Sequence, residues 1–319
     1  MTPAPATETV APLALGPAVQ LLRELGDLKR LRDARSPLSL ADRAFLRSWR
    51  RLLAGEEPGD VARAETAAAL AATRLAGVDA SVLRLAGLSP EEVVDVLRRG
   101  FDAVTSTAGR TLGELSDLRE ALGANASAGP GGERALPAPP PFAEALVRQP
   151  RAGATHPALP RVVVEPPESH GDHCFTTAVY AGLLAPLHGV DRGEAFFTML
   201  GHHLPNADLP DAGFGGEVLL GDLAPRVLGA LQERSLAQLP ARLADRLRGL
   251  LPLREDVGSA LGRACTSADV LDRVLQVHHH ARAAGFTAAQ ALDDLDIVHP
   301  GPVQEFQLRL LADAGLPVR

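Results

Sequence analysis

The chain has 319 residues, of which 46% are hydrophobic, and it carries a formal net charge of −7 at pH 7. This composition is sufficient for one large or two ordinary globular domains with a buried core. The acidic net charge and the low content of aromatic residues, 3%, disfavour bulk nucleic acid as a partner. Proteins that bind nucleic acid use basic surfaces for the phosphates and aromatic side chains for stacking on the bases.

Cysteine usage and the N-terminus indicate a cytoplasmic protein. The two cysteines, Cys174 and Cys265, are too few for a disulfide framework or a cysteine zinc site. The first 20 residues lack the basic residues that open a signal peptide. The longest uncharged run, 174–190, is shorter than a membrane span. We therefore expect neither export nor membrane association.

Leucine and alanine recur at helical spacing in the first third of the chain, which predicts four or five helices between Gly16 and Leu122. Helix starts are expected at Ser39 with Asp42, at Asp60 and at "SPEE", where Ser89 is the cap. This N-terminal helical region, 1–122, contains no histidine. We expect it to act as scaffold, or as a surface for a protein partner or for self-association.

A composition rich in Gly, Pro and Ala predicts a linker over 123–160. Helical periodicity dominates the rest of the chain, so the predicted fold class is all-α, with "RVVVE" at 161–165 as the one short strand. The C-terminal domain is expected over 161–319. All ten histidines lie at or beyond His156, so proton or metal chemistry is expected after the linker.

The first histidine segment is "ESHGDHCFTTAVYAGLLAPLHG", 168–189. On a helix beginning near Gly171, His173 shares a face with Thr177 and Tyr180 and points toward the core. Two interpretations stay open for His173, a hydrogen-bonded core histidine and a ligand. Asp172 lies at the helix start, where a carboxylate is favoured as a cap.

The second segment, "EAFFTMLGHHLPNADLPD", places two adjacent histidines at the end of an apolar helix that is expected to begin at Asp191 and reach Pro205. His202 and His203 can both approach one ion beyond that edge. Imidazole suits zinc and related borderline metals, so the pair is a credible part of a metal site if further ligands exist.

The third segment, "ACTSADVLDRVLQVHHH", places Asp269 on a helix, away from its apolar side and beside Arg273 and Gln276. That polar stripe is the candidate wall of a cleft. We interpret the run 278–280 as a solvated helix end, since His280 lies about 16 Å along the axis from Asp269. His299 precedes a proline and is expected in a turn.

Together, His173, the pair at 202–203 and Asp269 in "Ala-Asp-x-Leu" resemble the HD-domain superfamily of metal-dependent phosphohydrolases. The resemblance covers about 161–300 and implies an HD-domain-like helical bundle preceded by the N-terminal helical region. It also implies that His173, His202 and Asp269 are metal ligands.

The chain departs from that family at His203, where the family has an aspartate. His203 would then be the fourth ligand, and Asp208 is the candidate to supply a carboxylate from the following loop. This donor set favours one divalent transition metal ion, such as zinc, iron, nickel, cobalt or manganese. No histidine lies between His203 and Asp269, which indicates a mononuclear site.

The resemblance implies hydrolysis of a nucleotide or another small phosphate ester. Asp172, Asp208 and Glu168 are candidate proton acceptors, and Arg263 and Arg273 are candidate phosphate ligands. The alternative is a non-catalytic, degenerate HD-fold protein that regulates or binds a partner, which the replacement at His203 favours.

Overall fold

The computed structural model describes residues 13, 15–106, 109–127, 136–284 and 298–316. In this part of the chain the secondary structure is helical apart from one two-stranded sheet, so the predicted all-α class is confirmed. The elements before the sheet are α1 (Gly16–Gly26), η1 (Asp27–Lys29), α2 (Leu40–Leu53), α3 (Pro58–Leu75), α4 (Ala80–Leu85), α5 (Pro90–Thr105), α6 (Gly109–Leu112), α7 (Ser116–Ser127) and α8 (Pro141–Arg148).

The sheet pairs β1 (Ala154–His156) with β2 (Leu159–Val162) in antiparallel fashion. The elements that follow are α9 (His170–His188), α10 (Arg192–Leu200), η2 (Leu204–Ala207), α11 (Gly213–Val218), η3 (Gly221–Leu223), α12 (Ala224–Leu236), α13 (Ala241–Leu250), η4 (Leu251–Glu255), α14 (Ala260–Ala284) and α16 (Gln304–Asp313).

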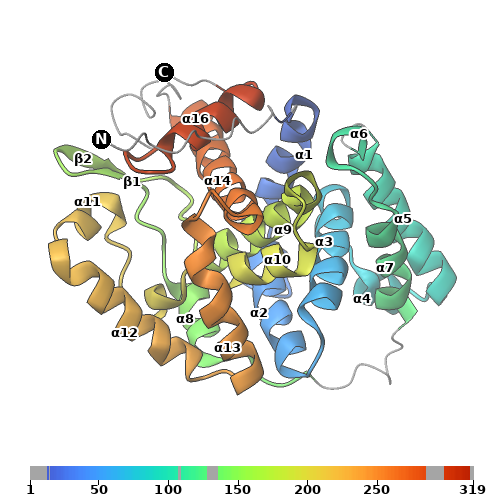
Figure 1. Cartoon of the computed structure of the whole chain (residues 1–319). Helices are drawn as coiled ribbons and strands as arrows, with labels where there is room; N and C mark the ends of the chain where they lie inside the picture. Colours follow the sequence, from blue (N-terminus) through green and yellow to red (C-terminus); the bar gives the residue numbers. More distant parts are fainter. Residues whose placement is uncertain (1–12, 14, 107–108, 128–135, 285–297, 317–319) are drawn as a thin grey trace.

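Helix α9 is the central element of the fold. Seventeen of its 19 residues are buried, as expected for a helix that is apolar on every side. It contacts α10, α14, α2, α8 and α3. In Figure 1 it lies with α10 in the middle of the molecule, between the N-terminal helices on one side and α11 to α13 on the other. Ser169 caps its start, and Gly189, at φ 70°, ends it in the left-handed conformation.

The N-terminal helices share one hydrophobic core with α9 and α10. Trp49 of α2 packs with its ring centroid 4.9 Å from that of Phe142 in α8 and 6.1 Å from that of Phe197 in α10. At Gly171 a β-carbon would lie 2.5 Å from the Asp42 carboxylate, so only glycine allows α2 to approach α9 this closely. Residues far apart in sequence therefore meet around α9.

The range 123–160 is not a structureless linker where the structure describes it. Residues 128–135 lie outside the described part, but α8 within the range buries Phe142, Ala143 and Leu146. The surrounding prolines indicated a linker, so this short amphipathic helix was not predicted. Its first turn begins with Pro141. The expected strand at 161–165 overlaps β2 only at Arg161 and Val162, and β1 was not predicted.

The predicted helix starts are largely confirmed. Ser39 accepts a hydrogen bond from the Asp42 amide at 2.9 Å, and Ser89 forms a capping box with Glu92. Helix α3 begins at Pro58, with Asp60 in its first turn. Between Gly16 and Ser127 the structure has seven α-helices rather than four or five, because the short helices α4 and α6 carry too few residues to show a period.

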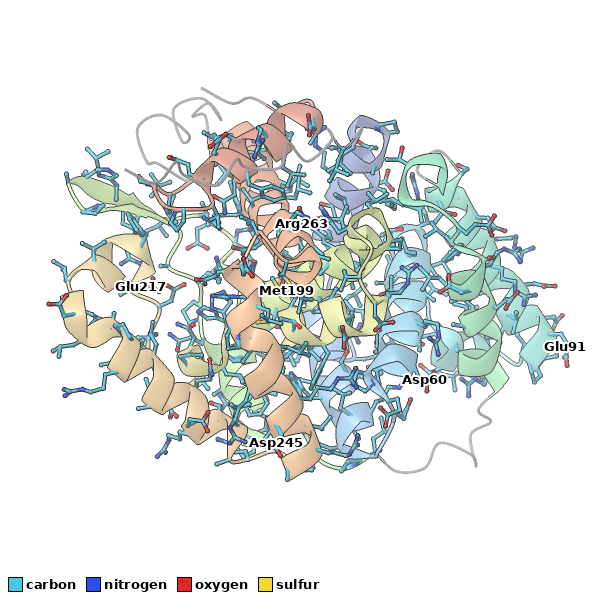
Figure 2. The ribbon with its side chains drawn as sticks, viewed as in Figure 1. Asp60, Glu91, Met199, Glu217, Asp245 and Arg263 are labelled. Atoms are coloured by element: carbon cyan, nitrogen blue, oxygen red, sulfur yellow. The ribbon has the colours of Figure 1, made fainter. Side chains whose placement is uncertain are left out.

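Charged side chains lie at the surface, together with several exposed hydrophobic ones such as Leu85 and Leu219. Asp60, Glu91 and Asp245 lie at the periphery, whereas Met199 is at the centre and fully buried (Figure 2). None of the helices in the described part of the chain combines the length and the apolar character that crossing a bilayer would need.

Truncating Phe142 tests whether α8 is an integral part of the core. We expect Phe142→Ala to lower the free energy of unfolding by about 3–5 kcal/mol, because the buried ring leaves a cavity. Urea denaturation measures the change. The control is Val163→Ala, since Val163 is 69% exposed, and its effect should stay within about 0.5 kcal/mol. A Phe142→Ala variant as stable as wild type would contradict the packing of α8.

Candidate metal centre

His173 lies in the first turn of α9 and is 1% exposed. Its Nδ1 is 2.8 Å from Oδ2 of Asp272, on α14. A carboxylate can only accept at this position, so Nδ1 donates this hydrogen bond. The ring is thus oriented by α14, with Nε2 turned toward His202.

The two adjacent histidines lie in the turn between α10 and η2, because α10 ends at Leu200 rather than reaching Pro205. His202 Nδ1 is 2.6 Å from the Met199 carbonyl oxygen. His203 Nδ1 is 2.8 Å from Oδ1 of Asn206. Both partners accept, so in both rings Nδ1 again holds the proton and Nε2 is free. Because His202 and His203 lie beyond the end of the helix, their two adjacent side chains can point toward the same space.

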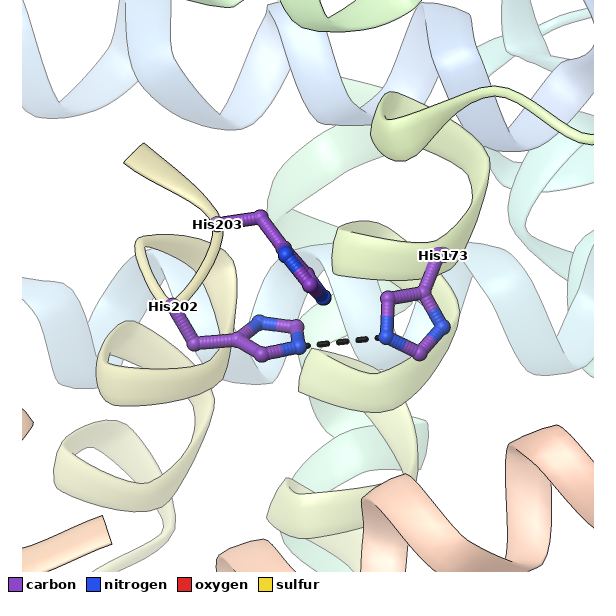
Figure 3. A group of neighbouring side chains, drawn as sticks. All are labelled: His173, His202 and His203. Atoms are coloured by element: carbon purple, nitrogen blue, oxygen red, sulfur yellow. Dashed lines mark hydrogen bonds between the residues drawn. The ribbon is translucent and has the colours of Figure 1, made fainter. Parts of the chain in front are cut away.

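The three rings of His173, His202 and His203 face one another, with ring nitrogens turned toward a shared space (Figure 3). The Nε2 atoms of His173 and His202 are 3.1 Å apart. Two lone pairs at that distance repel unless a proton or a cation lies between them. Zinc–nitrogen bonds of about 2.0–2.1 Å at a tetrahedral angle would separate two ligand nitrogens by roughly 3.3 Å. The cluster therefore has the chemistry and the spacing of a metal ligand set.

The environment keeps two of these rings neutral. Burial lowers the pKa of His202 well below its usual value, and neighbouring His173 and Arg254 add to the shift. Burial likewise lowers the pKa of His203, aided by His202 and by nearby cations such as Arg151. Metal binding requires the unprotonated imidazole, so both rings are in the binding form at neutral pH.

Asp269 approaches the cluster from α14, with Oδ1 3.3 Å from Nε2 of His173. Arg273 donates to its Oδ2 at 2.7 Å. Burial acts to raise the pKa of Asp269, but Arg273 and the histidines outweigh it and hold that pKa well below its usual value. The carboxylate is therefore ionised, and its side chain stays 30% exposed. Asp269 is thus close to His173, but it does not belong to the group of three imidazoles whose ligand atoms all lie within 4.8 Å of one another.

A cavity of about 570 Å³ opens beside the histidines. Asp269, Arg273 and Gln276 line it, as expected for the polar stripe of α14. Two further arginines, Arg151 and Arg254, lie in its wall. Its rim includes the Phe214 and His299 rings, stacked with centroids 4.2 Å apart. The cavity thus combines three guanidinium groups with a flat aromatic edge.

Three of the predicted site residues lie elsewhere and do not line the cavity. Asp172 is buried in the capping box of α9 and accepts from Ser39, which matches the capping interpretation. Asp208 pairs with Arg234 at 2.8 Å on the surface. Arg263 donates to the carbonyl oxygens of residues 257 and 258. The carboxylate that does reach the cavity from this loop is Asp211.

Sequence reasoning missed several residues of the site. Arg151 lies in the proline-rich segment, and its Nη1 is 3.3 Å from Nε2 of His203. Asp211 accepts from the amides of residues 152 and 213, both at 2.8 Å, and lies 3.5 Å from Nε2 of His170. Asp272 follows Asp269 by three residues and thus shares its face. Among the residues missed in this way, only Lys29 is conspicuous in the sequence, because it is the sole lysine.

The expectation of a solvated run at 278–280 is wrong for His280, which is 2% exposed and lines the cavity. Helix α14 continues to Ala284, so His280 falls one turn after Gln276 on the same face. Their side-chain nitrogens are 2.9 Å apart.

No family model, curated protein or solved structure matches this chain.

The capping region of α9 predicts an unusual pH dependence of stability. Burial raises the pKa of Asp42 to about 8, and the neighbouring Asp172, whose own pKa burial raises to about 6, adds to that shift. A folded-state pKa above the unfolded value near 3.9 means that the folded protein binds more protons. The stabilising contribution is complete below about pH 4 and is lost as pH rises toward about 8.

We therefore expect the free energy of unfolding to fall across this window by a few kcal/mol, on the order of what one buried carboxyl contributes. Asp42→Asn should flatten the dependence because an amide does not titrate, and its oxygen can still accept the hydrogen bond from the Ser169 hydroxyl, 2.5 Å away. Chemical denaturation at several pH values measures it. Asp245→Asn, at an exposed site, is the control, and an Asp42→Asn curve as steep as wild type would refute the assignment.

Proposed function

We propose that the chain is a metal-dependent phosphohydrolase that acts on a nucleotide or another small phosphate ester. The observation that carries the proposal is the convergence of three imidazoles, each of which is fixed by an acceptor at Nδ1 and turns its other nitrogen toward a shared space. Such outer partners orient metal-binding histidines and set their tautomer. The HD-domain resemblance of the sequence independently assigns His173, His202 and Asp269 to a metal.

The residues fit one divalent transition metal ion. His173, His202 and His203 would hold it through Nε2, with Asp269 as the oxygen donor. Imidazole-rich sites suit zinc, iron, nickel or cobalt, and the carboxylate also admits manganese. When bound, such an ion supplies Lewis acidity toward a phosphoryl oxygen and acidity to a coordinated water.

Arg151 is the residue we assign to the phosphate. Its guanidinium now donates toward Nε2 of His203 at 3.3 Å, the nitrogen that the ligand set needs. Burial acts to lower the pKa of Arg151, but surrounding carboxylates, Glu168 and Asp211 first among them, raise it. The group is thus a permanent cation at the cavity wall, and Nη1 can pass from the ring to a phosphoryl oxygen. Guanidinium suits this role because its donors match phosphate geometry.

The alternative function is a non-catalytic, partner-binding HD-like protein. It is favoured by the same contact from Arg151 to His203 and by the Arg273 ion pair that already neutralises Asp269. In this case the arginines satisfy the cluster without an ion. Metal content of the purified wild-type protein decides between the two functions.

Elemental analysis of untagged protein is the first test. We expect about one equivalent of a transition metal per chain in wild type and nearly none in His202→Ala, because a two-histidine site binds far more weakly. His279→Ala is the matched control, since His279 is exposed on α14, and it should keep full metal content. Wild type that holds no metal after purification without chelators, and takes up none on addition, would rule out the metal-dependent function.

Arg151→Gln tests phosphate recognition separately. Loss of a charge-assisted hydrogen bond, worth about 1.5–3 kcal/mol, should raise KM for phosphate esters about 10-fold or more, while metal content stays at the wild-type value. Steady-state kinetics with nucleoside monophosphates and p-nitrophenyl phosphate measure it. Arg263→Gln is the control, because Arg263 does not line the cavity, and its KM should equal that of wild type. Equal effects of the two variants would contradict the assignment.

A further inference from the structure

A second group of possible metal ligands shares His173 with the three-histidine group and consists of Glu168, His173 and Asp272. All three residues are buried. Nδ1 of His173 is 2.8 Å from Oδ2 of Asp272 and 3.7 Å from Oε1 of Glu168. The same imidazole thus turns Nε2 toward one ligand group and Nδ1 toward another.

A cation already lies in this second group. The Lys29 ammonium is 2.5 Å from Oδ1 of Asp272 and 3.0 Å from Oε1 of Glu168, and its side chain is 2% exposed. Lys29 is the last residue of η1 and the only lysine in a chain that otherwise uses arginine. An ammonium is a compact point charge, whereas a guanidinium is a planar fork, so lysine can fill a space of ionic size between two carboxylates.

We propose that Glu168, His173 and Asp272 form a latent divalent-metal site that the Lys29 ammonium fills from within the chain. Lys29 neutralises part of the carboxylate charge and leaves Nδ1 of His173 protonated toward Asp272. Because the ammonium fills this space, a metal ion can bind only at the three-histidine group. Removing the side chain opens a divalent-metal site with two carboxylates and one imidazole.

The charge of the group supports the replacement of the Lys29 ammonium by a metal ion. The Lys29 ammonium lies within 3.0 Å of a carboxyl oxygen of both acids. Burial alone would raise the pKa of Asp272, but Lys29 and His173 outweigh it and lower that pKa to about 2. The Asp272 carboxylate therefore needs a cation, and oxygen donors with one nitrogen suit Mn²⁺.

The two ligand groups compete for one ring. Both groups use the His173 ring, so the latent site is best measured where the three-histidine group is disabled. His202 belongs to that group and not to the latent one. The inference depends on neither hydrolysis nor metal at the first group, so either proposal can fail without the other.

The experiment compares Lys29→Ala/His202→Ala with His202→Ala. Equilibrium dialysis and electron paramagnetic resonance count bound Mn²⁺, and a thermal melt reports folding. We expect the double variant to bind one more equivalent of Mn²⁺ than His202→Ala. We also expect Mn²⁺ to raise its Tm by several degrees, because the ion binds only the folded chain.

Two controls separate cation replacement from general loss of stability. Lys29→Met/His202→Ala removes the charge but fills the space, and it should take up no additional Mn²⁺. Arg47→Ala/His202→Ala strips the buried Glu65 of a partner 2.6 Å away, and Mn²⁺ should not stabilise it, since Glu65 belongs to neither ligand group of the described residues.

Failure of Lys29→Ala/His202→Ala to bind Mn²⁺ while folded would overturn the proposal. A double variant that is unfolded without metal and does not recover in excess Mn²⁺ would overturn it equally.

Discussion

A buried imidazole needs a partner at each ring nitrogen, and His173 places this requirement at the centre of the fold. Its Nδ1 is satisfied by Asp272 at 2.8 Å. That carboxylate is ionised inside the protein and depends in turn on the Lys29 ammonium. The chain of contacts runs from η1 through α14 to α9, so the N-terminal helices are structurally part of the site. It also turns Nε2 of His173 toward His202, 3.1 Å away, and toward Oδ1 of Asp269, 3.3 Å away.

Acidic residues outnumber arginines in the lining of the cavity. Arg151, Arg254 and Arg273 line it together with six acidic residues, Glu168, Asp211, Glu217, Glu255, Asp269 and Asp272. Asp211 lies near Arg151, and Asp269 pairs with Arg273. A phosphate that entered this space would replace a carboxylate as the partner of an arginine. It would not meet an unpaired positive charge. Such an arrangement favours selection of the ligand by geometry over capture by net charge, because the attraction at long range is small.

The sequence was informative where a rule is local and silent where contacts are distant. Ser39 and Ser89 were predictable as caps because capping depends on residues three positions apart. His173, His202 and Asp269 could be placed near one another only through a family resemblance. Arg151 and Asp272 carry no such pattern, since their roles arise from packing across 52 and 99 residues. Helix α8 was missed because proline-rich composition outweighed a single buried turn around Phe142. The predicted lengths failed where a helix ends early, as α10 does before His202.

Lys29 has a consequence for the chemistry of the whole chain. Because it is the only lysine and is 4% exposed, the folded protein offers almost no side-chain amine to acylating reagents. An amine reagent can reach Nζ only when η1 separates from α14 and the ion pairs with Glu168 and Asp272 open. The rate of acylation at this one position therefore reports how often the contacts of η1 with Glu168 and Asp272 open, without any label having to be introduced.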